Sequence, residues 1–278
     1  MENIKISKEF ILSRLQSLMG LAVTFFLFEH LLTNSQIVLF FDDGSRFIKL
    51  VNFYQSIPYL KLVEIIFIAI PFLLHILIGI RYLINTDLNS FPSNGKRAQI
   101  LSSRNIAFSI QRLSAYIIGI ILIFHVVEMR FIKYPIKIAN SQFLVRLNPN
   151  KDLEKAAKRL DIRLIRKNDL NLIKEFEIEN IKLKDNKIFA VANTFGKATL
   201  ISVYNTFQNP FEIFLYSIFV IACAYHAING LYTFLLSWGV IFSLKHERFF
   251  SILACFIALI LTLIGLTSIF GNIFFGVK

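Results

Sequence analysis

The chain has 278 residues, of which 55% are hydrophobic and 30 are Phe, and its mean hydropathy is +0.61. This composition is typical of integral membrane proteins. Its net charge of +12 lies largely in short flanks and in one polar insert, so no nucleic-acid partner is expected. Cys223 and Cys255 fall in apolar segments and are expected to be small core residues, not a disulfide or a metal site.

Five apolar stretches are long enough to cross a bilayer. Because backbone polar groups in lipid must be satisfied within each segment, we expect all five to be helices. The first is too long for the core of a signal peptide, so it is expected to be a permanent span. The predicted spans cover residues 12–33, 60–84, 109–131, 210–236 and 249–275.

The short polar flanks carry the orientation signal. Lys and Arg gather before the first span, between the second and third, and between the fourth and fifth. Asp42 and Asp43 accompany two basic residues in the loop between the first two spans. Positive flanks stay in the cytoplasm, so the N-terminus is expected there and the C-terminus outside.

Residues 133–209 interrupt the apolar pattern and form a segment too long for a simple connecting loop. Asp152–Leu160 predicts a short helix, and Phe176–Val191, turning at Asp185 and Asn186, predicts a β-hairpin. We therefore expect a small α+β extramembrane insert on the outer face, although a solvated segment without chemistry stays open. The predicted division is 1–132 for three spans, 133–209 for the insert and 210–278 for two further spans.

Four histidines lie inside the predicted spans, at two depths. With a helical rise of about 1.5 Å per residue, His30 and His125 fall in the outer half of the membrane, and His75 and His226 in the inner half. A buried haem iron takes two axial ligands. The pattern therefore predicts two haem b groups, one held by His75 with His226 and the other by His30 with His125.

Other interpretations of these histidines remain. A single intramembrane histidine often only bonds to a neighbouring helix. A zinc site would need three or four ligands at one depth, and His246, in a short polar loop, has no expected ligand role. A non-haem transporter would have helices broken at mid-membrane, for which only Pro71 is a candidate.

Glycine and arginine residues support the haem interpretation. Gly79 and Gly230 follow His75 and His226 by one turn, where a small residue admits a flat macrocycle or a neighbouring helix. Arginines near the span ends are expected to bind haem propionates, unless they are ordinary flank charges. They are Arg14, Arg81, Arg112 and Arg130.

Six stretches resemble the five-helix, dihaem cytochrome b subunit of bacterial succinate dehydrogenases and fumarate reductases of the single-anchor type. They are RLQSLMG (14–20), FEHLLTN (28–34), VEIIFIAIPFLLHILIG (63–79), QRLSAYIIG (111–119), FHVVEMR (124–130) and YHAINGLYTFLLSWG (225–239). The resemblance implies an all-α integral membrane fold in the bacterial cytoplasmic membrane. Four helices would enclose two haems, and a fifth would complete the fold.

The resemblance also implies partners and a reaction. A flavoprotein with FAD and an iron–sulfur subunit would dock on the cytoplasmic side. Electrons from succinate would pass through the inner and then the outer haem to a quinone, expected to be menaquinone. The chain would be the quinone-reacting subunit and would not act on succinate alone. A dihaem cytochrome b of a formate dehydrogenase or hydrogenase is the alternative.

Carboxylates near the outer ends of the spans are candidates for the proton path that quinone reduction needs. Glu64 is the preferred candidate, with Glu29 and Glu128 nearby in depth, although an interfacial carboxylate without chemistry is also possible. The chain departs from the family in two respects. The insert replaces a short connection, and Ala224 stands where some relatives carry a carboxylate.

Overall fold

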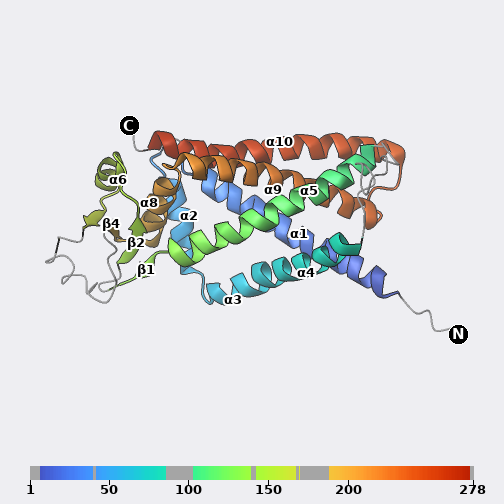
Figure 1. Ribbon diagram of the computed structural model, residues 1–278, viewed down its shortest axis with the longest axis horizontal. Coiled ribbons are helices and arrows are strands. Elements are labelled where there is room, and N and C mark those ends of the chain that lie inside the picture. The colour runs from blue at the N-terminus through green and yellow to red at the C-terminus, as the bar shows by residue number, and fades with distance from the viewer. Residues whose placement is uncertain are drawn as a thin grey trace. The chain divides into compact units, whose positions relative to one another are not determined.

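The computed structural model describes residues 7–39, 42–85, 103–138, 142–166, 169 and 188–275 (Figure 1). The chain divides into two compact units. Unit 1 consists of Met1–His30, Tyr59–Gly119 and Val220–Thr262. Unit 2 consists of Leu31–Pro58, Ile120–Phe219 and Leu263–Lys278.

Within the described residues, five helices are long and apolar enough to cross a membrane, and they confirm the all-α membrane fold. Many large apolar side chains on them are exposed, as lipid contact requires; Phe67 is 66% exposed and Ile120 is 75% exposed. The helices are α1 (Lys8–Ser35), α3 with η1 and α4 (Leu60–Asn85), α5 (Ser103–Val126) with η2 (Val127–Ile132), α9 (Pro210–Ser237) and α10 (Leu244–Phe275).

The second span contains a wide turn before Pro71. It starts as α3 (Leu60–Glu64), becomes the π-helical segment η1 (Ile65–Ala69), and continues as α4 (Ile70–Asn85). In η1, the Ile70 N–H donates to the carbonyl of Ile65, five residues back. Proline cannot donate a helical hydrogen bond, and its ring crowds the preceding turn. The wide turn provides room, so Pro71 lies in a continuous helix and not at the break that a transporter would need.

Two expectations about single residues need correction. Cys223 and Cys255 are free thiols, but Cys255 is exposed on its helix, so it is not a core residue. Its apolar segment faces outward at that position. His246 lies in the first turn of α10, not in a loop, because the helix already begins at Leu244.

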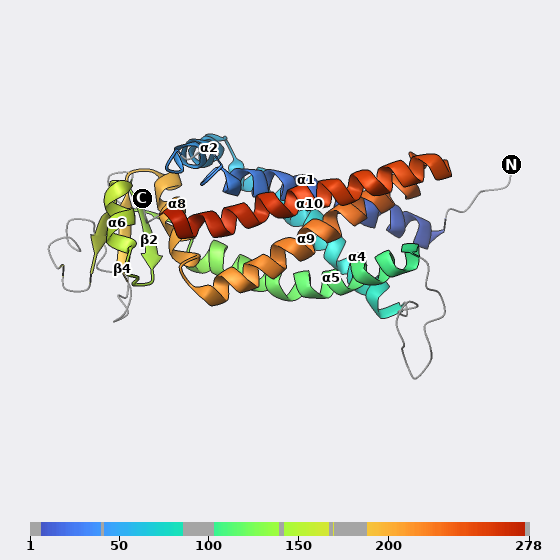
Figure 2. The same ribbon diagram turned by 90° about the horizontal axis from the view of Figure 1, so that it is seen from above.

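The insert forms a small antiparallel sheet with helices, which confirms the α+β expectation. Figure 2 shows β2, β4, α6 and α8 gathered at one end of the chain's unit 2. The predicted short helix is present as α6 (Leu153–Arg159). The sheet has the order β1-β2-β4-β3, with β1 (Ile136–Lys137), β2 (Phe143–Leu147), β3 (Arg163–Ile165) and β4 (Ile188–Ala192).

The hairpin predicted over 176–191 falls mostly on residues outside those that the structure describes. Its described end belongs to β4, which pairs with both β2 and β3. Val145 lies opposite Ala190, and Leu164 also lies opposite Ala190 on the other side. The central strand is almost fully buried, as a strand flanked on both sides should be.

Two further helices of unit 2 were not predicted. They are α2 (Ser45–Ser56), in the connection between the first two spans, and α8 (Phe195–Thr206). They approach closely at Gly196, where an added Cβ would lie 2.6 Å from the carbonyl oxygen of Ile48. The Gly196 N–H donates to Asn52 Oδ1 at 2.8 Å. The insert therefore shares one core with the first connection, and this core includes Ile37, Phe47, Val145, Leu147, Leu153, Leu200, Ile201 and Tyr204.

Candidate functional site

His75 and His226 meet inside unit 1, as the sequence predicted. Their ring centroids are 6.2 Å apart and their planes are at 89°. Two imidazoles on opposite sides of one metal ion have centroids roughly 6 Å apart, because each metal–nitrogen bond is about 2 Å long. Perpendicular rings are compatible with this arrangement, since each ring can turn about its own bond to the metal. The spacing therefore fits axial ligation of one haem.

Hydrogen bonds at Nδ1 fix the orientation of both imidazoles. His75 Nδ1 lies 3.1 Å from the backbone oxygen of Gln16. His226 Nδ1 lies 3.2 Å from the backbone oxygen of Gln111 and 3.2 Å from Ser114 Oγ. A carbonyl only accepts, so Nδ1 must carry the proton in each ring. The lone pair is then on Nε2, which is the nitrogen that would bind iron.

The glutamine side chain of Gln111 fastens α5 to α9 beside this pair. Its Nε2 donates to the backbone oxygen of His226 at 2.9 Å, and its Oε1 accepts from Asn229 Nδ2 at 2.9 Å. No role was predicted for Gln16, Gln111, Ser114 or Asn229. The available signal was their polarity inside apolar segments, where polar groups need partners on other helices.

Three glycines line this part of unit 1, but only one touches a ligand. A Cβ on Gly20 would lie 2.9 Å from His75 Cε1, so Gly20 allows α1 to approach the ring. A Cβ on Gly79 would lie 3.3 Å from Gln16 Nε2, and one on Gly230 would lie 3.5 Å from Gln111 Nε2. Gly79 and Gly230 therefore serve close helix packing around the pair.

The predicted propionate partners differ in their surroundings. Arg112 is only 8% exposed and donates to the backbone oxygen of Leu83 at 3.1 Å. Arg81 forms a surface ion pair with Glu9. Arg14 donates to a backbone carbonyl and stacks near Trp238, 5.3 Å from its ring centroid. A buried guanidinium needs an anion more than an exposed one does, so Arg112 fits a propionate best.

In unit 2, His125 begins a buried chain of hydrogen bonds. Its Nδ1 lies 3.2 Å from Tyr216 Oη, and Tyr216 donates its hydroxyl to Glu128 Oε2 at 2.9 Å. Glu128 forms an ion pair with Lys133, whose Nζ also donates to Thr206 Oγ1 at 2.8 Å. Tyr216 is 5% exposed and Glu128 is 7% exposed. Neither Tyr216 nor this chain was predicted.

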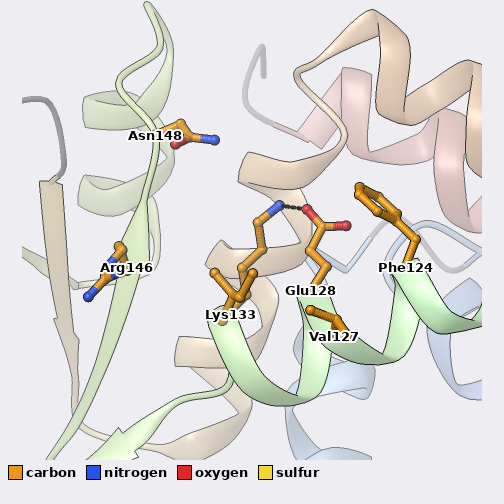
Figure 3. A pocket seen from close by; sticks show the side chains of 7 residues that line it. Phe124, Val127, Glu128, Lys133, Arg146 and Asn148 are labelled. Carbon is orange, nitrogen blue, oxygen red and sulfur yellow. Dashed lines mark hydrogen bonds and ion pairs between the residues drawn. The ribbon is translucent and has the colours of Figure 1, made fainter.

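Glu128 and Lys133, the charged end of this hydrogen-bond series, line a pocket of about 220 Å³. Figure 3 shows Glu128 and Lys133 joined on one side, with Arg146 and Asn148 of the insert on the other. Arg130, also expected near this end, lies with its guanidinium 4.5 Å from the ring centroid of Tyr134. The pocket is lined by Phe124, Val127, Glu128, Ile132, Lys133, Arg146 and Asn148.

The predicted roles of His30 and Glu64 are not tested by their surroundings in the structure. His30 stacks on Phe26 in unit 1, with ring centroids 5.4 Å apart, whereas His125 belongs to unit 2. Their pairing therefore stays a prediction. Glu64 is half-buried at the end of α3, directly before η1, and its role in a proton path also stays a prediction. Among the described residues, no three His, Cys, Asp or Glu side chains gather as a metal site.

Comparison with known proteins identifies the family. The sequence profile described as succinate dehydrogenase/fumarate reductase transmembrane subunit matches residues 2–110 and 188–265, which include His30, His75 and His226. A similar protein is the succinate dehydrogenase cytochrome b558 subunit of Bacillus subtilis (strain 168), 22% identical over 267 residues that cover 95% of this chain and 98% of that protein. With more than half of its length matched and five apolar helices, the chain belongs to the succinate dehydrogenase/fumarate reductase transmembrane subunits, the membrane cytochrome b family of these complexes.

Proposed function

We propose that this chain carries electrons from an iron–sulfur subunit to a quinone through two haem b groups. The geometry of His75 and His226 is the observation that carries this proposal, because their spacing and Nδ1 bonds suit two axial ligands. When bound, the haems supply one-electron carriers inside the membrane. Two imidazoles saturate the iron, which suits electron transfer and not oxygen binding.

Each residue around the first haem has a distinct task. His75 and His226 would supply the nitrogens that bind the haem iron. The carbonyls of Gln16 and Gln111 accept from Nδ1 of these rings, which fixes the ring orientations and leaves Nε2 as the basic nitrogen. Arg112, buried near the end of α4, would hold a propionate.

The second haem would be held by His30 and His125. A flavoprotein with FAD and an iron–sulfur subunit would dock on the cytoplasmic side, where the predicted topology also puts the N-terminus and the basic flanks. The complex would lie in the bacterial cytoplasmic membrane, surrounded by lipid. The similar protein from Bacillus subtilis is itself named as a succinate dehydrogenase subunit, which supports this assembly.

Difference spectroscopy tests the haem assignment. The purified chain should show two b-type components and two haems per polypeptide. His75→Ala and His226→Ala should remove the same component, whereas His30→Ala and His125→Ala should remove the other. His246→Ala is the control and should keep both. A colourless chain produced with ample haem would contradict the proposal, as would purification of the membrane complex without flavoprotein and iron–sulfur subunits.

Glu64 is proposed to belong to the path of the quinone or its protons, with menaquinone as the expected quinone. It lies next to η1, and π-helical turns often occur at functional sites. Glu64→Gln should lower quinone reductase activity while both haem components persist. Glu154→Gln, which alters an exposed carboxylate of α6, is the control. Unchanged activity in Glu64→Gln would contradict this role.

A further inference from the structure

Hydrogen-bond donation converges on Glu128 from two sides. Tyr216 and Lys133 each donate to its carboxylate. Tyr216 donates its one proton to Glu128 at 2.9 Å, so its oxygen is left to accept from His125 Nδ1 at 3.2 Å. His125 then carries its proton on Nδ1, and Nε2 is the nitrogen for iron. The orientation of the imidazole is thus connected to a carboxylate that does not touch it.

Glu128 is held in place by the wide turn at the end of the third span. In η2, the Lys133 N–H donates to the backbone oxygen of Glu128, five residues back, at 2.8 Å. The same turn allows the Lys133 ammonium to pair with the Glu128 side chain. Both side chains are largely buried, with 11% and 9% exposed. A buried carboxylate is stable only when paired and hydrogen-bonded, and here both conditions are met.

The surroundings of His125 differ from those of the other paired ligands. His75 and His226 have Nδ1 beside uncharged backbone oxygens. His125 has Nδ1 beside a tyrosine that is polarised by a carboxylate. A partner that withdraws the Nδ1 proton more strongly makes the ring a stronger electron donor to iron. Stronger donation favours the oxidised state of the metal and lowers its potential.

We propose that Glu128 is a positioning residue for the haem ligand His125, acting through the hydroxyl of Tyr216, with Lys133 balancing its charge. This inference rests on the proposed function, since it takes His125 as an iron ligand. Glu128 sets the ring orientation and lowers the potential of the haem that His125 binds. Lys133 acts in the opposite direction, because it offsets the negative charge.

Redox titration of the purified complex with both haems present tests the proposal. Glu128→Gln and Tyr216→Phe should each raise the midpoint potential of one haem and leave the other unchanged. Lys133→Gln should lower the potential of the same haem. The low-spin electron paramagnetic resonance signal of that haem should also change its g-values in Tyr216→Phe, because the ring loses its orienting bond. A purely structural role would not give opposite shifts in the Glu128 and Lys133 variants.

The double variant Glu128→Gln/Tyr216→Phe tests whether Glu128 acts through Tyr216. It should shift the potential no further than Tyr216→Phe alone, because coupled residues are not additive. Glu212 is also buried, lies one turn before Tyr216, and interacts with the side chains of Glu128 and Lys133. Glu212→Gln therefore changes the same cluster but keeps the bond between Tyr216 and Glu128, so it should shift the same haem less than Glu128→Gln does. Ser217→Ala, next to Tyr216, should shift neither haem.

Three results would overturn the inference. They are an unchanged potential in Glu128→Gln with both haems retained, additive shifts in the double variant, and equal shifts of both haems. If Glu128→Gln loses a haem on purification, Lys133→Gln still decides, because an upward or absent shift contradicts the proposal. Failure of the underlying function is distinguishable, since His125→Ala would then keep both haem components.

Discussion

The two regions that hold the predicted ligands are built differently. In unit 1, His75 and His226 face each other, and both are oriented by uncharged backbone oxygens. In unit 2, His125 is oriented by a tyrosine joined to an ion pair. The same type of ligand thus has neutral surroundings in one region and charged surroundings in the other. Under the proposed function, this difference would separate the redox potentials of the two haems.

The regions also differ in what connects to them. Among the described residues, the neighbours that contact His75 and His226 belong to the apolar spans; they are Gln16, Gly20, Gln111 and Ser114. The hydrogen-bond series that starts at His125 continues through Lys133 to Thr206, which belongs to α8 of the insert. A mutation in the insert can therefore alter the hydrogen bonding of His125. The surroundings of His75 and His226 provide the reference for measuring that effect.

The largest expected effect comes from Gly20→Val, which should disrupt the site of His75 and His226 and leave the surroundings of His125 unchanged. A Cβ at this position would lie 2.9 Å from His75 Cε1 and 3.2 Å from Nδ1, so the ring must move. We expect loss of the haem component of His75 and His226, with the other component retained, in a reduced-minus-oxidised spectrum. Gly119→Val is the comparison, because a Cβ there meets no described atom within 4 Å. Retention of both components in Gly20→Val would contradict the close approach of α1.

Gly196→Ala should disturb the charged region through the insert. The new Cβ would lie 2.6 Å from the backbone oxygen of Ile48, which cannot move as a side chain could. Overpacking of this kind costs about 1–3 kcal/mol, so α2 and α8 should exchange amide hydrogens faster. The haem held by His75 should keep its spectrum. Lys197→Ala, at the neighbouring position, should change exchange much less, and equal effects of both variants would refute the steric argument.

Gln111→Leu should weaken the neutral region without removing a ligand. It deletes the bonds to the backbone of His226 and to Asn229, each 2.9 Å long. Each bond contributes about 1 kcal/mol, so the haem spectrum of His75 and His226 should be lost at a lower temperature. Asn229→Ala removes only one of these bonds and should have about half the effect. An unchanged melting temperature in Gln111→Leu would show that other contacts hold α5 to α9.

Thr194→Ala should have the smallest effect, and it tests whether a local change at the start of α8 affects either haem. The Thr194 side chain caps α8 by accepting from the Lys197 N–H at 3.3 Å. Loss of such a cap costs about 1 kcal/mol, which should appear as faster exchange in the first turn of α8. Thr194→Ser keeps the acceptor and should restore slow exchange. Neither haem component should change, and a change in either would show that the first turn of α8 also influences a haem.

Sequence patterns predicted the spans well because span length and apolarity follow directly from bilayer thickness. The meeting of His75 and His226 was also predicted, from the rise of a helix and the alternation of direction between spans. Arg112 was named from its position, although its burial and the contact of Gly20 with His75 were not foreseen.

The residues around the ligands could not be predicted in the same way. Tyr216 and Gln111 act on histidines of other helices, and a linear sequence does not give the rotation of one helix against another. The pairing of α2 with α8 was missed for a similar reason, since they are far apart in the chain and are joined by tertiary packing, which includes their shared core and the close approach at Gly196. The wide turn η2 has no proline to signal it.

The wide turn before Pro71 has a consequence for how this protein tolerates change in length. A π turn contains one more residue than an α turn and completes its circle with that extra residue included. Deleting one residue within 65–69 would let an α turn replace the π turn, so Glu64 and His75 would keep nearly the same directions around the helix. A single-codon deletion here would therefore remove the room before Pro71 while leaving the membrane crossing and the direction of Glu64 nearly unchanged.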